Sequence, residues 1–182
     1  AGEWVLIHGG AGGVGLAAIQ IAKARGARII ATAGTREKRA LLRLIGADHV
    51  FSSRSPGFYD QVRTAVPQGV DVVLNSLAGE MMERSLELIR PFGRFLELGK
   101  RDYYENAKIA LRPFRRNVSY FGIDVDQIMQ HDPRLAQELM AEIGHQMARG
   151  ELRPLPYRCF DAGEIPAAFR LMQQSGHIGK II

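Results

Sequence analysis

The sequence predicts an α/β fold built around a doubly wound parallel sheet. Apolar runs of strand type alternate along the chain with segments whose apolar residues recur at helical spacing. Such alternation is typical of a parallel sheet, because each helix returns the chain to the edge where the next parallel strand begins. With 182 residues, 46% of them hydrophobic, and no internal repeat, the chain fits one compact domain over residues 1–182.

The first strand and the first helix enclose a glycine-rich turn. Trp4 to Ile7 is an apolar strand, and residues 14–25 have helical spacing. The intervening glycines follow the pattern G-x-G-x-x-G, which permits a tight turn, close approach of the backbone to a pyrophosphate, and close packing of helix on strand. The helix N-terminus offers free N–H groups to the anion. We therefore expect a Rossmann-type dinucleotide site, the alternative being a turn that only connects two elements. The residues of this site are Gly10, Ala11, Gly12, Gly13, Val14 and Gly15.

The remaining elements follow from periodicity, length and the Gly and Pro residues that end each segment. A helix with Leu41, Leu42 and Ile45 on one face follows the second strand. Asp132 and Pro133 predict the start of a long helix that runs to residue 147. Further strands are expected at residues 28–33, 49–51, 70–74, 93–98, 118–123 and 177–182, and further helices at 58–66, 81–89 and 164–174.

The turn after the second strand indicates which dinucleotide is bound. Sites for NAD usually place Asp or Glu about 20 residues beyond the glycines, where it holds the ribose hydroxyls. Here the turn reads Ala33-Gly34-Thr35-Arg36, and Lys38 and Arg39 follow closely. The nearest acid, Glu37, lies in the first turn of a helix, where a carboxylate has an ordinary dipole role. The absence of an acid and the presence of cations predict NADPH, with a solvated basic turn as the alternative.

Composition limits the other classes of function. The net charge of +5 comes from separate basic groups at residues 36–43, 101 and 112–116, so a phosphate-bearing cofactor or carrier is favoured over nucleic acid. No apolar run approaches the roughly 20 residues of a membrane span, and the first residues lack a signal-peptide profile, so a cytoplasmic location without a membrane partner is expected. One cysteine, Cys159, allows neither an internal disulfide nor a cysteine-cluster zinc site, and no metal is expected.

Several segments, in order, resemble the enoyl reductase domain of modular type I polyketide synthases. That domain belongs to the medium-chain dehydrogenase/reductase superfamily, which also holds the quinone oxidoreductases. The resemblance implies that this chain is the nucleotide-binding half, and that a substrate-binding half lies outside it. VLNSLAGE followed by ELGK is the more specific part. The matching segments are IHGGAGGVG, ATAGTREKRALL, VDVVLNSLAGE, GRFLELGKRD and AFRLMQQSGHIGKII.

The resemblance also assigns the cofactor residues. It places the 2′-phosphate near Thr35 and Lys38, and the nicotinamide and its ribose near Asn75, Ser76 and Leu77. Asn75 and Ser76 follow one predicted strand, and Gly99 and Lys100 follow the next. Ligands of open parallel sheets bind beyond the carboxyl ends of the strands, so these residues are expected to converge on the glycine turn. The alternative for Asn75 and Ser76 is a cap on the next helix.

The implied reaction transfers a hydride from NADPH to the β-carbon of an α,β-unsaturated thioester and a proton to its α-carbon. Lys100 is the catalytic candidate, as proton donor or as the cation that stabilises the enolate. Asp124 resembles the family's partner for this lysine, with Asp102 and Asp126 as competing acids. The alternative is that Lys100 and Asp124 are ordinary surface charges. His8 borders the turn but is expected to satisfy local hydrogen bonds.

The resemblance implies partners as well. The substrate is an enoyl group on an acyl carrier domain, and the other domains of the synthase are neighbours. A homodimer is expected through an edge strand at residues 118–123, which is apolar enough to be paired. Two alternatives stay open: a free-standing NADPH reductase of the quinone oxidoreductase type, and a cofactor-binding or dimerisation module without catalysis.

Overall fold

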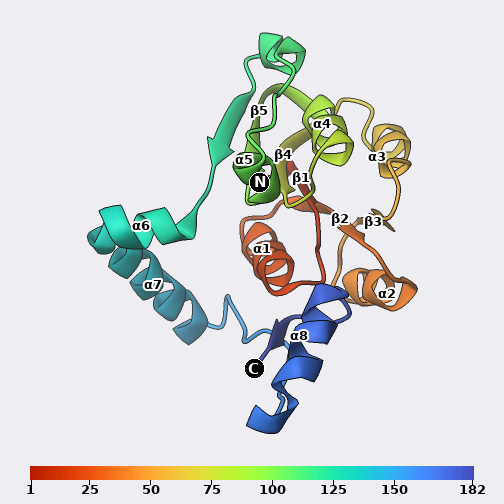
Figure 1. The fold of residues 1–182 in the computed structure, drawn as a ribbon. Helices are drawn as coiled ribbons and strands as arrows, with labels where there is room; N and C mark the ends of the chain where they lie inside the picture. The colour runs from red at the N-terminus through yellow and green to blue at the C-terminus, as the bar shows by residue number, and fades with distance from the viewer.

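The computed structural model describes all 182 residues and contains a six-stranded parallel sheet (Figure 1). The strand order is β3-β2-β1-β4-β5-β6, so the chain begins in the middle, moves outward to β3, and returns to place β4 beside β1. This reversal confirms the doubly wound fold and makes the carboxyl ends of β1 and β4 the switch point at which ligands bind. The strands are β1 (Trp4–Ile7), β2 (Arg28–Ala33), β3 (His49–Ser52), β4 (Val70–Asn75), β5 (Ile89–Glu97) and β6 (Ser119–Gly122).

Helices cover both faces of this sheet. Because successive strand residues point to opposite faces, Leu6 joins one hydrophobic cluster, with Phe58 and Leu86, and Ile7 joins the other, with Ile19 and Leu42. Burial on both sides explains why the strands are continuously apolar. The first cluster lies under α3 (Phe58–Ala65) and α4 (Glu80–Glu87), and the second under α1 (Gly13–Ala24) and α2 (Arg36–Leu44).

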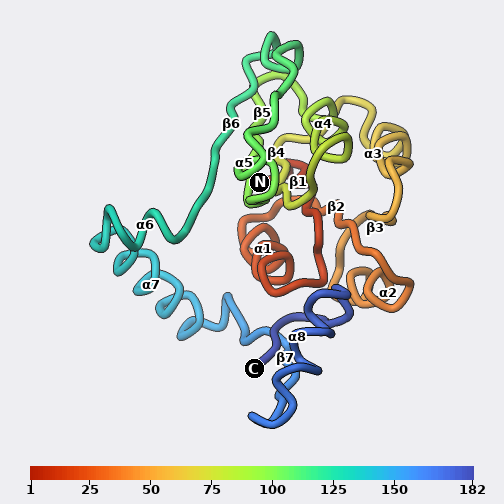
Figure 2. The backbone as a smooth tube through the Cα atoms, in the orientation of Figure 1, coloured from red at the N-terminus to blue at the C-terminus, as the bar shows by residue number.

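The last third of the chain leaves the sheet and returns to the glycine turn. Figure 2 shows the path running from β6 outward through α6 (Val125–His131) and α7 (Pro133–Ala148), then back to α8 (Ile165–Gln173) beside α1 and α2. The strands β7 (Tyr157–Arg158) and β8 (Lys180–Ile181) form a separate parallel pair, and the 3₁₀ turn Ala162–Glu164 and α8 lie between them in the chain. The backbone N–H of Gly179 donates to the carbonyl of Ala11 at 2.9 Å, so the C-terminal segment is bonded directly to the turn.

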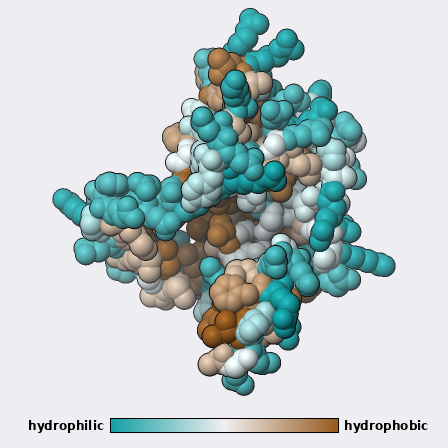
Figure 3. Space-filling view, in the orientation of Figure 1, coloured by the Kyte–Doolittle hydropathy of each residue, from teal (hydrophilic) through white to brown (hydrophobic).

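Apolar side chains on α7 and α8 are exposed. Figure 3 shows brown, apolar surface on the inner side of the α6–α7 arm and on the lobe formed by α8. No helix of the chain is both long and apolar enough to cross a membrane. The exposed side chains are Leu135, Leu139, Met140, Ile143 and Met147 on α7, and Ile165, Phe169 and Met172 on α8.

Most predicted elements are present within a few residues of their expected bounds, and the strand at 28–33 has the same bounds. The helix expected at 81–89 ends at Glu87 instead, because Ile89 already begins β5. This strand starts before the expected residue 93 and is interrupted near Phe92, whose φ of 63° breaks the pattern. Five elements were not predicted because they are too short for periodicity: α5 (Arg101–Tyr104), the 3₁₀ turns Arg112–Arg116 and Ala162–Glu164, α6, and β7.

Candidate functional site

Two cavities meet at the glycine turn. The first, about 500 Å³, lies between the turn, the start of α2 and the end of α8, and its polar lining includes Lys38 and Arg54. The second, about 280 Å³, lies between the turn and the carboxyl end of β4, and its lining includes Asn75. Gly9 and Gly12 line both cavities. An elongated ligand with two ends can therefore lie across the turn with one end in each cavity.

The glycines of the turn have distinct structural roles. Gly9 has a φ of 61°, so the tight turn requires glycine at this position. The motif assigns that role to its first glycine, Gly10, instead. Gly10 packs on α2, where an added Cβ would lie 3.2 Å from the Leu42 methyls. At Gly15 an added Cβ would lie 2.5 Å from the carbonyl oxygen of Gly9, so the close packing is of the helix on the turn, whereas the motif predicted packing of helix on strand. At Gly12 the nearest atom would be 3.4 Å away, which leaves this backbone open to a ligand.

The N-terminus of α1 faces the space between the two cavities. Gly12 is the N-cap, and no side chain accepts a hydrogen bond from the first turn of the helix. Gly13 and Val14, the first two helical residues, line the second cavity. Uncapped N–H groups and the positive end of the helix dipole together favour an anion at this point.

The first cavity carries two cations and no acid among its lining residues. Thr35 caps α2, since its hydroxyl accepts from the Lys38 N–H at 3.3 Å. The Lys38 ammonium donates to the Ser175 carbonyl at 2.5 Å, and burial and the nearby Arg54 lower the pKa of Lys38. Arg39 instead donates to the carbonyls of Ala33 and Gly34, so it holds the turn. The structure thus adds Arg54, which sequence analysis missed, to the expected Thr35 and Lys38.

Asn75 at the second cavity is fully buried and engaged on both sides. Its Nδ2 donates to the carbonyl of Leu77 at 2.8 Å and to Oε2 of Glu97 at 2.7 Å. Its Oδ1 accepts from the Leu77 N–H at 3.2 Å. The alternative that Asn75 caps the next helix is wrong, because α4 begins only at Glu80 with Gly79 as its N-cap. Asn75 shapes the loop after β4 instead.

Lys100 lies at the same edge of the sheet, two residues beyond Leu98 of the second cavity. Its ammonium is 3.0 Å from Asp124 and 2.7 Å from Asp126. Asp102 does not contact it and accepts from the Gly79 N–H at 3.0 Å. Hydrogen bonds to Asp126 and Asp124 raise the pKa of Lys100 above its ordinary value, and the bond from Lys100 lowers the pKa of Asp124. A lysine held in this way keeps its charge, which suits stabilisation of an anion better than release of a proton.

His8 is buried and linked to two hydroxyls. Its Nδ1 lies 2.9 Å from the hydroxyl of Thr32, and its Nε2 lies 2.8 Å from that of Ser85. Burial lowers the pKa of His8 to about 3. The neutral ring therefore ties β1 to β2 and α4, which agrees with the expectation that this histidine satisfies local hydrogen bonds.

This burial predicts a pH-dependent stability. Because the pKa of His8 is about 3 in the folded chain and near 6.5 when unfolded, its stabilisation is present above pH 6.5 and is lost as the pH falls toward 3. Between pH 7 and pH 5 the protein should lose about 2 kcal/mol more unfolding free energy than His8→Gln, which keeps a polar side chain that does not titrate. Urea unfolding at the two pH values measures this difference. Equal losses in both proteins would contradict the account, since the other histidines are common to both.

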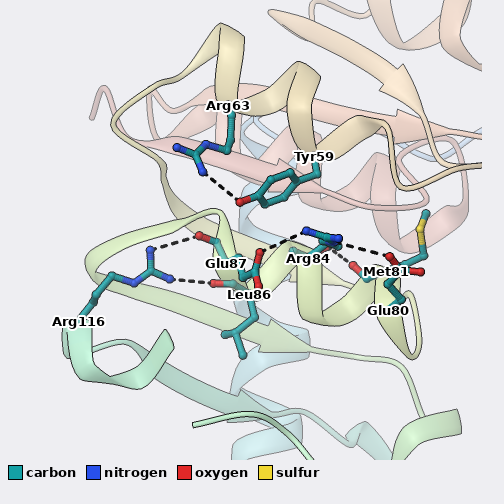
Figure 4. Close-up of polar contacts among 9 residues, drawn as sticks. Tyr59, Arg63, Glu80, Met81, Arg84, Leu86, Glu87 and Arg116 are labelled. Carbon is teal, nitrogen blue, oxygen red and sulfur yellow. Dashed lines mark hydrogen bonds and ion pairs between the residues drawn. The ribbon is translucent and has the colours of Figure 1, made fainter. Parts of the chain in front are cut away.

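A third groove, about 870 Å³, lies between α3, α4 and the Arg112–Arg116 turn, and shares no lining residue with the two cavities. Figure 4 shows two of its cations, Arg63 and Arg116, bonded to groups of the fold. Arg63 donates to the Tyr59 hydroxyl at 3.2 Å. Arg116 donates to the carbonyls of Leu86 and Glu87 at 3.4 and 3.2 Å, where the last carbonyls of α4 need partners. Part of the basic group at 112–116 is thus structural.

A doubly wound sheet with an uncapped helix and a glycine turn at its switch point defines a dinucleotide-binding domain of the Rossmann type. The chain belongs to the zinc-binding dehydrogenase family, whose profile matches residues 13–142, and within the medium-chain dehydrogenase/reductase superfamily it is the nucleotide-binding half of an enoyl reductase.

Three relatives support this assignment. A highly reducing polyketide synthase of Emericella nidulans, AN6791, is 44% identical over the whole chain, which spans 7% of that synthase. CurK enoyl reductase has a TM-score of 0.88 and 42% identity, covering 99% of this chain and 54% of that one. The nucleotide-binding subdomain of the enoylreductase domain of PpsC from Mycobacterium tuberculosis has a TM-score of 0.79 and 43% identity, covering 84% of this chain and 86% of the subdomain.

The family name implies zinc, but the residues of this chain do not fit a zinc site. Zinc in proteins is held by three or four Cys, His, Asp or Glu side chains. No group of three or more such side chains lies close enough together to hold a metal ion.

Proposed function

We propose that this chain holds NADPH for the reduction of an α,β-unsaturated thioester, carried on an acyl carrier domain during polyketide chain elongation. The observation that carries the proposal is the pair of cavities joined at the glycine turn, with Lys38 and Arg54 at one end and Lys100 near the other. Lys38 and Arg54 would face the 2′-phosphate of the cofactor, and Lys100 would face the thioester oxygen that becomes negative during the reaction. The similarity to polyketide synthase enoyl reductases supports the substrate class.

The residues divide the work along the cofactor. NADPH, when bound, supplies the hydride that reaches the β-carbon. The N–H groups at the start of α1 would hold the pyrophosphate, and Thr35, Lys38 and Arg54 would hold the 2′-phosphate. The loop of Asn75, Ser76 and Leu77 and the segment at Gly99 would flank the nicotinamide. Lys100 would stabilise the negative charge on the thioester oxygen while an acid of the substrate-binding half, outside this chain, would donate the proton to the α-carbon.

We further propose that residues 1–182 form a single cofactor domain whose reductase is completed by a substrate-binding half. The exposed apolar side chains of α7 and α8 support a protein surface lying against them. Other synthase domains would be neighbours. A second copy would pair along β6, which is an edge strand of the sheet and exposes Phe121. Because half of the cleft would lie outside this chain, we expect little or no turnover from it alone.

Selectivity for NADPH tests the 2′-phosphate assignment. Lys38→Ala and Arg54→Ala should each weaken NADPH binding roughly 10- to 100-fold, because a hydrogen bond to a charged group contributes about 1.5–3 kcal/mol. The affinity for NADH should change by less than about threefold, since NADH lacks the phosphate. Fluorescence titration of the unsubstituted chain and of the two variants with both nucleotides gives the six dissociation constants.

The matched control is Arg36→Ala, which removes a cation from the same helix but not from the lining of the cavity. It should leave the preference for NADPH intact. If the unsubstituted chain bound both nucleotides equally, or if Lys38→Ala weakened both to the same extent, the phosphate would have to be placed elsewhere.

A further inference from the structure

The carboxylate of Glu97 is buried between two loops of the proposed nicotinamide site. Glu97 is the last residue of β5, and 2% of it is exposed. Its Oε2 accepts from the Asn75 amide at 2.7 Å, and its Oε1 accepts from the Gly99 N–H at 2.6 Å. One side chain thus links the end of β4 to the segment that leads into Lys100.

The backbone arrangement makes this link a short one. Asn75 and Glu97 are paired residues of neighbouring parallel strands. Asn75 holds Leu77 through both the N–H and the carbonyl of that residue. The chain of bonds therefore runs from Leu77 through Asn75 and Glu97 to Gly99, and it sets the spacing of the two loops. Gly99 fits closely, since an added Cβ would lie 2.8 Å from Oε1 of Glu97.

The two N–H donors that face Glu97 require a side chain whose two terminal atoms both accept hydrogen bonds. Both Asn75 Nδ2 and Gly99 N point an N–H at Glu97, and a carboxylate accepts from both at once. A glutamine of the same shape accepts from one donor and turns its NH₂ toward the other. Burying a carboxylate is unfavourable, and burial raises the pKa of Glu97 despite the bonds from Asn75 and Gly99. An apolar residue at this strand position would avoid that penalty.

We propose that Glu97 is a positioning residue that fixes the Asn75–Leu77 loop and the Gly99–Lys100 segment relative to each other. The nicotinamide and the Lys100 ammonium would thereby be held at a fixed distance from each other. Glu97 itself lines neither of the two cavities. This inference rests on the proposed function for what occupies the space between the loops.

Glu97→Gln tests the proposal in this chain and in the complete reductase that contains it. In this chain the Kd of NADPH should change by less than about threefold, because the phosphate contacts are untouched, while the enhancement of nicotinamide fluorescence on binding should fall. In the complete reductase kcat should fall roughly 10- to 100-fold, since a misplacement of about 1 Å costs that much. The KM for NADPH should stay nearly constant.

Asp71→Asn is the matched control. Asp71 is also a buried acid of this sheet, but it lies at the opposite end of β4, where it accepts from the Trp4 N–H and pairs with Arg90. Its substitution should lower the free energy of unfolding and leave the fluorescence enhancement and kcat unchanged. Gly99→Ala disturbs the Glu97 contact from the loop side and should give the fluorescence signature of Glu97→Gln, so it decides the matter if Glu97→Gln does not fold.

The proposal is overturned if Glu97→Gln, or Gly99→Ala in its place, behaves like Asp71→Asn, with stability lowered and the nicotinamide signal and kcat intact. Failure of the proposed function looks different. In that case the unsubstituted reductase would not reduce enoyl thioesters, while the fluorescence comparison in this chain would still report whether Glu97 positions the nicotinamide.

Discussion

Replacing Lys100 by alanine should lower kcat of the complete reductase roughly 10²- to 10³-fold, which is the usual effect of removing one group that stabilises a developing oxyanion. The Kd of NADPH should stay within about threefold, because Lys100 does not line either cavity. Steady-state rates with an enoyl thioester and a nucleotide titration provide both values. Arg101→Ala is the control, since this neighbouring cation is paired with Glu105 at 2.9 Å on the surface.

The pH profile separates the two roles considered for Lys100. Hydrogen bonds to Asp126 and Asp124 raise its pKa above the ordinary value near 10.5, so the ammonium stays charged up to pH 10.5 and above. As a charged stabiliser it should therefore produce no fall in kcat between pH 7 and about pH 10. An alkaline fall in that range that disappears in Lys100→Ala would contradict this role and indicate a lysine that releases its proton.

The second large effect concerns two glycines three positions apart. Gly15→Ala should destabilise the fold by about 1–3 kcal/mol, because its Cβ would collide with backbone atoms of Gly9 and Gly10 that have no room to move. Gly12→Ala should cost less, at most about 1 kcal/mol, since its Cβ meets one atom at an ordinary distance, its φ of −77° suits alanine, and only the preference for glycine over alanine at the N-cap is lost. Urea unfolding of the two variants measures this contrast.

For nucleotide binding, Gly12→Ala should be the variant with the direct effect. Gly12→Ala places a methyl group on the backbone that both cavities share, so the affinity for NADPH and for NADH should fall together by roughly 10-fold or more. A stable Gly12→Ala protein with unchanged affinity for both nucleotides would mean that the pyrophosphate does not approach this turn. A Gly15→Ala protein of normal stability would contradict the close packing of α1 on the turn.

The sequence predicted the doubly wound sheet well because each buried strand carries its own signal. The strand at 28–33 is apolar and lies between breaks at Gly26 and Gly34, and its bounds agree with the structure. The signal for the start of α7 is also local in sequence, because Asp132 caps this helix by accepting a hydrogen bond from the Leu135 N–H at 3.0 Å. Features of this kind depend only on residues a few positions apart.

The parts that were missed depend on neighbours in space. Arg54 reaches the first cavity only because β3 lies beside β2, which the sequence does not state. Glu97 sits in an apolar strand, where an acid is ordinarily expected to face solvent, and its partner Asn75 is 22 residues away. The sequence offered Asp126 only as a competitor of Asp124, whereas both contact Lys100, because a short helix, too brief to be predicted, begins between them. A cation two residues beyond the third strand was the one available signal for Arg54.

The measurement that tests the account most directly is turnover by the complete reductase with NADPH and two acceptors, an enoyl thioester of a pantetheine analogue and a quinone. NADPH deuterated at C4 should deliver deuterium to the β-carbon of the thioester, with NADH as a much poorer donor and quinone reduced slowly or not at all. Efficient reduction of the quinone without any reduction of the thioester would contradict the account, and would identify a reductase of the quinone oxidoreductase type.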